Sequence, residues 1–487
     1  MLDQQSTTEN LQGYPISQLV GLLVGAGFLL MTVALPPPES MTVEAWSALG
    51  LMLLMATWWS TEAIPIPATA LLPVVLVPGL GLGSISQATS PYAHPIIFLF
   101  LGGFTLGLAM QRWELHRRIA LMTLRAVGNE PKRQVAGFML ATAFLSMWVS
   151  NTATAIMMLP IGLSVISMMG NGQPENVQRY ATALLLAIAY SASVGGIATL
   201  IGTPPNALLA AYLSETQGVS VGFAQWMLLG VPVATVMLAL IWWWLTRHDF
   251  GLVAQEGAGE AIRDELAALG KMSRGEKLVA VVFVLTASAW IFRPLLSASI
   301  MPWLTDTGIA ISAAIAMFII PVSVRQQTFV LDWDAAKGIP WGVLLLFGGG
   351  LAMAGVISSS GLASWIAESM GVASALPLIV MITLVVAVII FLTEVTSNTA
   401  TTAAFLPLLG ALALSQEISP LLLTIPAAIA ASCAFMMPVA TPPNAIVFSS
   451  GDMKIGDMIR AGFALNIIGI VVVTLLCYLL MDFVFTI

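Results

Sequence analysis

The sequence predicts an all-α polytopic membrane protein with eleven transmembrane helices, two re-entrant helical hairpins, an inverted repeat and two broken helices. Three observations support this prediction: an apolar composition, long uncharged runs along the whole chain, and three short motifs that each occur twice. Of the 487 residues, 58% are apolar and 8% are charged, whereas a soluble domain carries about a quarter charged residues. The chain therefore has too few polar side chains to cover a water-facing surface, and we expect a lipid bilayer to surround it.

The uncharged apolar runs predict the individual crossings. Each run has about 17 residues or more, which is enough to cross a hydrocarbon core of about 30 Å as a helix. An outer-membrane barrel would instead show alternating segments of about ten residues. Two further apolar stretches, 135–168 and 375–414, are interrupted near their midpoints by Ser-Asn-Thr, and we expect both to form re-entrant hairpins. The eleven predicted crossings lie near 17–35, 43–60, 64–80, 93–111, 181–212, 226–245, 278–296, 306–323, 339–357, 420–449 and 462–485.

The basic residues predict the orientation. Cytoplasmic loops retain Lys and Arg, and with the N-terminus inside, only Arg293 of the 17 basic residues falls on the external side. Counting either hairpin as a full crossing would destroy this pattern. We therefore expect a multi-pass protein of the bacterial inner (plasma) membrane with a cytoplasmic N-terminus. The N-terminal tail has no basic n-region, so no cleavable signal peptide is expected.

Three duplicated motifs indicate an internal repeat. The fourth and ninth predicted crossings run in opposite directions, so the two copies are inverted. The pairs are Leu101-Gly-Gly with Phe347-Gly-Gly, Ser150-Asn-Thr-Ala-Thr with Ser397-Asn-Thr-Ala-Thr, and Thr203-Pro-Pro-Asn-Ala with Thr441-Pro-Pro-Asn-Ala, at offsets of 246, 247 and 238 residues. The predicted segments are an N-terminal cytoplasmic tail (1–16), N-terminal scaffold helices (17–92), the first inverted repeat (93–246), a cytoplasmic linker (247–277), the second inverted repeat (278–461) and a C-terminal helix (462–487).

The duplicated motifs also predict chemistry. Pro-Pro inside an apolar run removes two amide donors and leaves carbonyls free, so the segments that start at Thr203 and Thr441 should break their helices. Irregular backbone at membrane depth is tolerated where it lines a cavity or is buried in protein. Free carbonyls with Ser, Thr and Asn side-chain oxygens are ligands for a hard cation, while amides at helix N-termini attract anions.

The Ser-Asn-Thr sequences complete these sites. Four residues before each serine lies another hydroxyl, Ser146 before Ser150 and Thr393 before Ser397. In a helical arm this spacing places both oxygens on one face. We expect two cation sites that each combine one hairpin tip with one broken helix, and an anion between them.

The predicted spans and hairpins contain no Lys or Arg in their cores. Bound cations and helix dipoles would then supply the positive field for an anion, because an anion among neutral side chains is costly to desolvate. Glu394 is the acidic residue expected deep in the second hairpin. An intramembrane carboxylate is a functional candidate, and the sequence leaves open whether Glu394 couples a cation or proton or accepts hydrogen bonds from backbone amides.

The paired Ser-Asn-Thr-Ala-Thr motifs, the paired Thr-Pro-Pro-Asn motifs and the inverted repeat resemble the divalent anion/sodium symporter (DASS) family, which includes the proteins called INDY. The resemblance extends from about the second span to the end of the chain. It implies a homodimer in which a transport domain moves by an elevator mechanism against a scaffold, driven by inward sodium gradients. It further implies a secondary transporter that imports C4-dicarboxylates (succinate, malate, fumarate) with about two or more sodium ions, and no nucleic-acid partner.

The same resemblance assigns the site residues. The first sodium site would use Ser146, Ser150, Asn151 and the backbone near Gly202. The second sodium site would use Thr393, Thr396, Asn398 and the backbone near Ala440. Substrate carboxylates would meet Asn151, Thr152, Ser397, Asn398 and Thr399, with Thr203, Thr441 and Pro442 nearby.

The same sequence features also bear on alternative functions. An intramembrane enzyme is disfavoured, since the spans carry no paired aspartates, no Ser-His pair at plausible depth and no HExxH motif. An anion channel stays open as an alternative, although broken helices in inverted repeats favour alternating access. Within transport, a sodium-independent dicarboxylate exchanger and a sodium-coupled citrate or sulfate symporter also stay open. The glycines at 102, 103 and 348–350 are expected to allow close helix packing rather than to bind phosphate.

Overall fold

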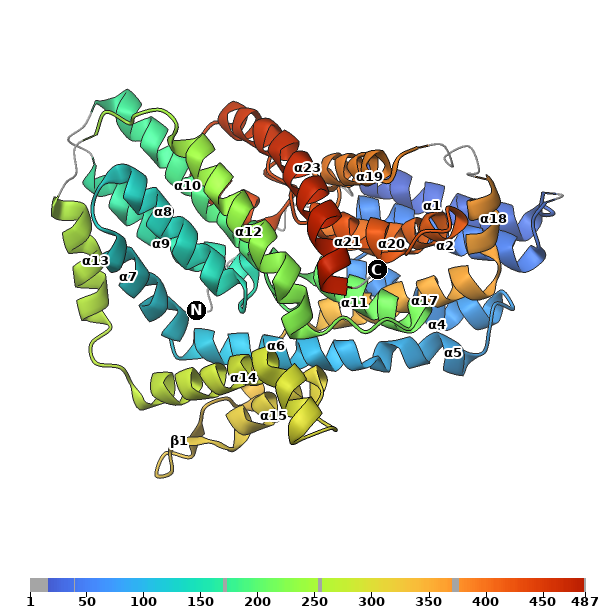
Figure 1. The fold of residues 1–487 in the computed structure, drawn as a ribbon, viewed down its shortest axis with the longest axis horizontal. Coiled ribbons are helices and arrows are strands. Elements are labelled where there is room, and N and C mark those ends of the chain that lie inside the picture. Colours follow the sequence, from blue (N-terminus) through green and yellow to red (C-terminus); the bar gives the residue numbers. More distant parts are fainter. Residues whose placement is uncertain (1–15, 39, 170–172, 253–255, 370–375, 486–487) are drawn as a thin grey trace, which may run out of the picture.

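The computed structural model describes residues 16–38, 40–169, 173–252, 256–369 and 376–485, and these ranges are mostly helical (Figure 1). Nine helices within them are long and apolar enough to cross a membrane by length and composition. A short antiparallel hairpin pairs β1 (Pro321–Ser323) with β2 (Thr328–Phe329), with Pro321 opposite Phe329. The predicted class, a helical multi-pass membrane protein, is confirmed at this level.

The N-terminal third differs from the prediction in one crossing. The apolar run 64–80 was expected to form one helix, but the structure divides it into two short helices with a turn at Ala70 and Leu71. Prolines explain the division, because Pro73 lacks the amide that would continue the helix through the turn. The elements are α1 (Ile16–Ala34), α2 (Val43–Thr61), α3 (Ile66–Thr69), α4 (Leu72–Gly79), α5 (Ile85–Thr89), the 3₁₀ turn η1 (Ser90–Ala93) and α6 (Pro95–Arg112).

The two copies of the repeat have the same element order. Each has a long helix with the glycine motif, a short amphipathic helix, a helical hairpin, a broken helix and a final long helix. In the first copy these are α6, α7 (Leu115–Val127), α8 (Pro131–Ser146), α9 (Asn151–Met168), α10 (Pro174–Ile197), α11 (Pro204–Gln217) and α12 (Phe223–Thr246). In the second copy they are α17 (Trp341–Ser359), α18 (Leu362–Ser369), α19 (Leu378–Thr393), α20 (Asn398–Ser415), α21 (Leu421–Ala430), α22 (Pro442–Phe448) and α23 (Ile455–Phe485).

Four helices, with the hairpin of β1 and β2 between the third and the fourth, join the copies. The charged segment 247–277 contains one helix, α13, which the sequence analysis did not predict. The joining helices are α13 (Glu256–Ala268), α14 (Arg274–Ser299), α15 (Asp306–Ile319) and α16 (Trp333–Ala336).

The centre of the packing is α10. All residues from Ala183 to Ile197 are buried, and α10 packs against α8, α9 and α12 of its own copy and α22 of the other copy. Tyr190 adds a polar link between the copies, since its hydroxyl donates to the Phe435 carbonyl at 2.7 Å. The broken helices of the two repeats are therefore held against each other in the core.

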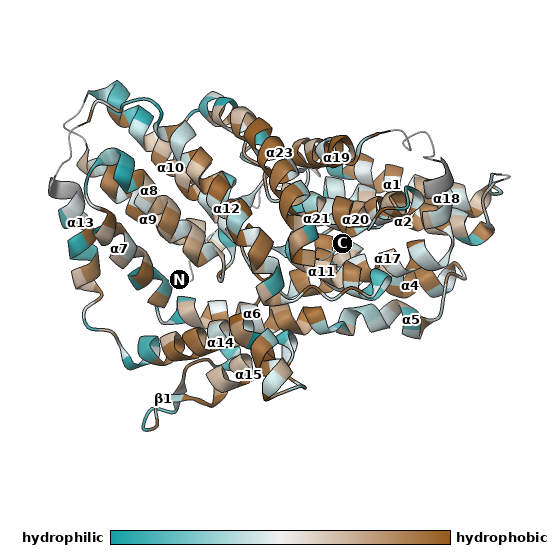
Figure 2. Ribbon diagram, viewed as in Figure 1, coloured by the Kyte–Doolittle hydropathy of each residue, from teal (hydrophilic) through white to brown (hydrophobic). Residues whose placement is uncertain are grey.

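Apolar surface marks the helices that face lipid. Figure 2 shows hydrophobic residues along α12, α14 and α23, and hydrophilic residues around α13 and the start of α10. On α14, Leu285 and Leu295 are 64% and 67% exposed. Water would penalise so much exposed apolar surface, whereas the hydrocarbon core accepts it.

The duplicated glycines serve close packing, as expected. A side chain at Gly102 would lie 2.5 Å from the Ala310 backbone, and one at Gly349 would lie 2.3 Å from the Ala70 carbonyl oxygen. Helices α6 and α15, and likewise α17 and the turn after α3, approach this closely because no Cβ intervenes.

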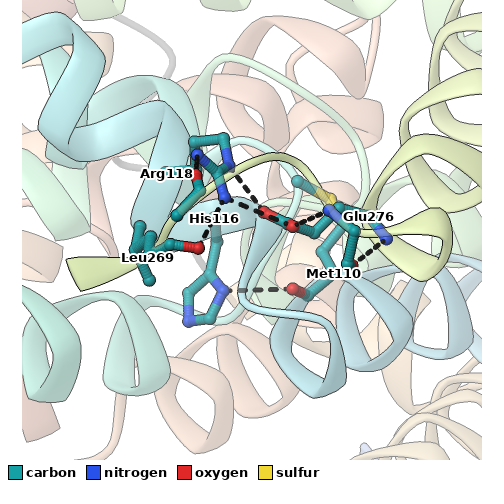
Figure 3. Close-up of polar contacts among 7 residues, drawn as sticks. Met110, His116, Arg118, Leu269 and Glu276 are labelled. Atoms are coloured by element: carbon teal, nitrogen blue, oxygen red, sulfur yellow. Dashed lines mark hydrogen bonds and ion pairs between the residues drawn. The ribbon is translucent and has the colours of Figure 1, made fainter. Parts of the chain in front are cut away.

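An ion pair fixes α7 to the start of α14. Arg118 Nε donates to Glu276 Oε1 at 2.6 Å, and its terminal nitrogens also reach the carbonyls of Leu269 and Gly270. Figure 3 shows this guanidinium between the carboxylate and the loop that follows α13, with His116 beside it. Burial lowers the pKa of His116, so its ring is neutral at pH 7, and Nδ1 lies 3.1 Å from the Met110 carbonyl.

Candidate functional site

Both Ser-Asn-Thr sequences form the turns of helical hairpins. The helix α8 ends at Ser146 and α9 begins at Asn151, while α19 ends at Thr393 and α20 begins at Asn398. At the first turn Ser150 is the N-cap, and its hydroxyl accepts from the Ala153 amide at 3.3 Å. Each asparagine is thereby the first residue of a helix, where free backbone amides favour negative charge.

Both Thr-Pro-Pro-Asn sequences restart broken helices, as predicted. After α10 ends at Ile197 the chain runs irregularly until α11 begins at Pro204, and after α21 ends at Ala430 it does so until α22 begins at Pro442. The prolines suit the first turn of each new helix, because backbone amides there have no acceptor within the helix and a missing amide costs no hydrogen bond.

The asparagines that end these motifs bind the free carbonyls. Asn206 Nδ2 donates to the carbonyls of Gly196 and Thr199 at 3.1 and 2.8 Å. In the other copy Asn444 Nδ2 donates to the carbonyls of Ala434 and Met437, both at 3.1 Å. Both asparagines are fully buried. Each therefore ties the new helix to the end of the broken one.

A cluster of oxygens lies behind the first turn. The Ser146 hydroxyl oxygen is 2.5 Å from Asn151 Oδ1 and 2.6 Å from the Ala192 carbonyl oxygen. A hydroxyl has one proton, so it can donate to only one of these oxygens. The Asn151 amide atom that lies closest to the Ser146 hydroxyl is also 3.1 Å from the Ala192 carbonyl oxygen and 3.2 Å from the Gly202 carbonyl oxygen.

The orientation of the Asn151 amide decides what this cluster does. With the nitrogen toward the carbonyls, the amide donates hydrogen bonds to them. With the oxygen there, four oxygens converge and only the Ser146 hydroxyl has a proton to donate. Oxygen clusters of that kind are ligands for hard cations. Gly196 makes the convergence possible, since a Cβ there would be 2.9 Å from the Gly202 carbonyl oxygen.

The second turn has the corresponding cluster. The Thr393 hydroxyl oxygen is 2.5 Å from Asn398 Oδ1 and 3.2 Å from the Ala431 carbonyl oxygen. Thr396 does not join this set; its hydroxyl lies 2.6 Å from Thr401 Oγ1 and donates to the Leu392 carbonyl. The two clusters thus share one pattern, a buried hydroxyl, an asparagine side chain and a carbonyl from the broken helix.

One cavity of about 1010 Å³ lies in front of both turns. Ser146 and Thr393 are fully buried behind it, whereas the two asparagines belong both to the clusters and to the cavity wall. Among the described residues, the cavity lining includes no Lys, Arg or His. Of the predicted site residues, it brings together Ser150, Asn151, Thr152, Gly202, Thr203, Thr396, Ser397, Asn398, Thr399, Ala440, Thr441 and Pro442.

Glu394 lies away from this cavity and is 3% exposed. Its carboxylate accepts hydrogen bonds from the backbone amides of Phe435, Met436 and Met437 at 2.7 to 3.0 Å. The side-chain amide of Asn466 on α23 donates to Oε1 at 2.7 Å. Of the two roles left open by the sequence, the geometry favours hydrogen bonding to backbone donors, which fixes the irregular segment between α21 and α22.

Several residues of the site were not predicted. The carbonyls of Ala192 and Ala431 carry no signal in the sequence, because any residue supplies a backbone oxygen. The asparagines at 206 and 444 had a usable signal, since they close the duplicated Thr-Pro-Pro-Asn motifs, but only the break was inferred from them. The partnership of Asn466 with Glu394 depends on tertiary packing alone.

Comparison with known proteins adds the family. Residues 16–487 match the family described as sodium:sulfate symporter transmembrane region. The sodium-dependent dicarboxylate transporter SdcS of Staphylococcus saprophyticus is 42% identical over 484 residues, which cover 96% of this chain and 92% of the relative. SdcS of Staphylococcus aureus (strain USA300) is 42% identical over 494 residues, 98% of this chain and 94% of the relative.

Two solved structures share the fold. The YdaH transporter of Alcanivorax borkumensis has a TM-score of 0.58 at 14% identity and covers 96% of this chain and 99% of its own. MtrF of Neisseria gonorrhoeae, described as illuminating a class of antimetabolite efflux pumps, has a TM-score of 0.60 at 12% identity, with 96% and 95% covered. The family match extends over nearly the whole chain and agrees with the resemblance of its duplicated motifs: this multi-pass membrane protein, a transporter rather than an enzyme, belongs to the divalent anion/sodium symporter family.

Proposed function

We propose that this protein imports C4-dicarboxylates such as succinate, malate and fumarate together with sodium ions. The observation that carries the proposal is the position of Asn151 and Asn398. Each lines the shared cavity and also contacts a buried hydroxyl at 2.5 Å. A cation behind each asparagine and an anion in front of both would be bound by the same two side chains.

Charge explains why the two kinds of ion would move together. A dicarboxylate in a cavity without basic side chains pays a large desolvation cost. Two sodium ions in the clusters, one near Ser146 and one near Thr393, would offset that cost. A bound cation would also favour the oxygen of each amide toward the cluster, which turns the amide nitrogen toward the cavity as a donor for a carboxylate. The named activity of the SdcS relatives is in accord with this assignment.

The finer architecture belongs to the same proposal. Eleven crossings, two hairpins that enter from opposite sides and a cytoplasmic N-terminus in the bacterial inner membrane agree with the distribution of Lys and Arg. Transport would proceed by an elevator motion in a homodimer. The matching element order of the two copies supports alternating access, because inverted repeats can exchange their conformations.

Uptake of labelled succinate into proteoliposomes tests this function. Inward gradients of sodium, lithium, potassium or protons are applied in turn, and unlabelled malate, fumarate, citrate and sulfate compete. We expect saturable uptake that requires sodium and is inhibited by malate and fumarate. Uptake that persists without any cation gradient but requires internal dicarboxylate would identify an exchanger, and inhibition by sulfate alone would identify a sulfate symporter, the activity in the family description.

A further inference from the structure

The cavity in front of the two turns extends to the end of α2. Beside the turns, it is lined by Ser60, Thr61 and Glu62, which end that helix, and by Gln18 of α1. Glu62 is exposed. Glu62 is therefore a solvent-exposed part of the same cavity lining to which both asparagines belong.

Glu62 is the one charged residue in the described lining of this cavity. Its carboxylate has no hydrogen bond or ion pair with any other residue that the structure describes. The basic residue at the end of α6, Arg112, is instead paired with Asp332 at 2.6 Å. The cavity that is expected to receive a dianion thus carries one negative charge and no positive one among its described residues.

The backbone of Glu62 is held firmly while its side chain is free. The amides of Glu62 and Ala63 both donate to the Trp58 carbonyl, and Glu62 has a left-handed conformation with φ 48°. Trp58 and Trp59 anchor this helix end through their indole nitrogens, which donate to Leu22 and Ile66. Glycine or asparagine is the usual residue in such a conformation, so the acidic side chain is not required for the turn itself.

We propose that Glu62 sets the charge selectivity of the open cavity: it concentrates sodium there and weakens the hold on the dicarboxylate. This inference rests on the proposed function, and it concerns a residue that contacts neither ion directly. An unscreened carboxylate attracts cations and repels anions over distances of about a Debye length. Its effect should favour release of the dianion whenever the cavity is open on the side of Glu62.

The expected size follows from Coulomb's law. If the separation across water is on the order of 10 Å, a unit charge changes the dissociation constant of a dianion about fourfold and that of sodium about twofold in the opposite direction. Screening at physiological ionic strength, where the Debye length is about 8 Å, reduces the fourfold effect to less than twofold. The dissociation constants of the two ions should change in opposite directions, and both changes should shrink as salt is added. These two features distinguish an electrostatic field from a direct ligand.

Binding to the purified full-length protein tests the proposal. Succinate titrations at fixed, saturating sodium give the dissociation constant, and sodium-dependent thermal stabilisation without dicarboxylate reports sodium binding. For Glu62→Gln we expect tighter succinate binding, by up to about fourfold at the lowest ionic strength that saturating sodium allows, and up to about twofold weaker sodium binding. Both changes should shrink as choline chloride is added, and Glu62→Asp should behave like the wild type.

Two controls separate charge from backbone effects. Glu417, which follows α20, has the same left-handed conformation with φ 56°, is exposed and does not line the cavity. Glu417→Gln should leave both ions unaffected, whereas Glu62→Gly should reproduce the binding changes of Glu62→Gln. Unchanged binding in Glu62→Gln, equal changes in Glu417→Gln, or changes that resist choline chloride would overturn the inference. Failure of the wild type to bind succinate in a sodium-dependent way would instead contradict the proposed function.

Discussion

The hydroxyl oxygen of Ser146 lies 2.5 Å from the side-chain amide of Asn151, behind the cavity that Asn151 lines. Thr393 and Asn398 repeat this relationship at the same distance in the other half of the chain. With the oxygen of each amide toward its hydroxyl, one hydroxyl proton faces several oxygens, an arrangement that favours a cation among them. The expected effects of single substitutions follow from this arrangement.

The first prediction concerns sodium affinity. Ser146→Ala removes one buried oxygen from the first cluster without reaching the cavity. We expect the sodium concentration for half-maximal succinate uptake to rise about tenfold, as for the loss of one bond to a charged partner, with near-normal maximal rates at saturating sodium. Ser167→Ala, on the exposed face of the same hairpin, serves as the control. An unchanged sodium dependence in Ser146→Ala would exclude this hydroxyl from the cation site.

The second prediction concerns the shared asparagines. Asn151→Ala and Asn398→Ala each remove a side chain that contacts both a cluster and the cavity. Loss of a cation ligand and of a carboxylate donor together should lower uptake at least about 100-fold, since each contact to a charged group contributes about 1.5–3 kcal/mol. Proteoliposome uptake measures this, with Asn176→Ala at the start of α10 as control. Near-normal transport by both variants would contradict the site assignment.

The duplicated motifs predicted the turns at Asn151 and Asn398 and the breaks before Pro204 and Pro442, because proline and small polar residues act on the local backbone. The carbonyls of Ala192 and Ala431 could not be predicted, since the position of a backbone oxygen depends on how α10 and α21 pack against the hairpins.

The same reasoning explains the errors in the fold. Residues 64–80 read as one apolar span because apolar content hides a break that Pro73 introduces. The helices α7 and α13 were missed because they are short and carry many charges, so neither gives the long apolar run that identifies a crossing. Asn466 was missed because its partner, Glu394, is 72 residues away in the chain.

The third prediction assigns Glu394 a structural role. Glu394→Gln places an amide nitrogen among donors from Phe435, Met436, Met437 and Asn466. Unmatched buried donors should destabilise the protein by about 3 kcal/mol and lower the thermal midpoint, and transport should fall because the broken segment loosens. Glu417→Gln on the surface should change neither. If Glu394→Gln kept its thermal midpoint but lost sodium or proton coupling, the carboxylate would instead belong to the transport chemistry.

The last prediction concerns the clamp between α7 and α14. The side chains of Arg118 and Glu276 are only 11% and 6% exposed, and Arg118 also donates to the Gly270 carbonyl. Removing one partner leaves the other charge nearly buried with only backbone hydrogen bonds to compensate it, and breaking a buried pair in this way costs about 3 kcal/mol. We therefore expect Arg118→Ala and Glu276→Gln each to lower the thermal midpoint strongly.

A double-mutant cycle separates the energy of the ion pair between Arg118 and Glu276 from the loss of other contacts in each single variant. The double variant Arg118→Ala with Glu276→Gln should be destabilised by clearly less than the sum of the two single variants, because the second change removes the charge that the first left unpaired. The exposed pair of Arg133 and Glu130 has side chains 70% and 54% exposed, and its cycle should give a coupling of at most about 1 kcal/mol. Additive effects at Arg118 and Glu276 would show that the ion pair does not hold α7 to α14, and that the hydrogen bonds of Arg118 to the loop after α13 supply the attachment.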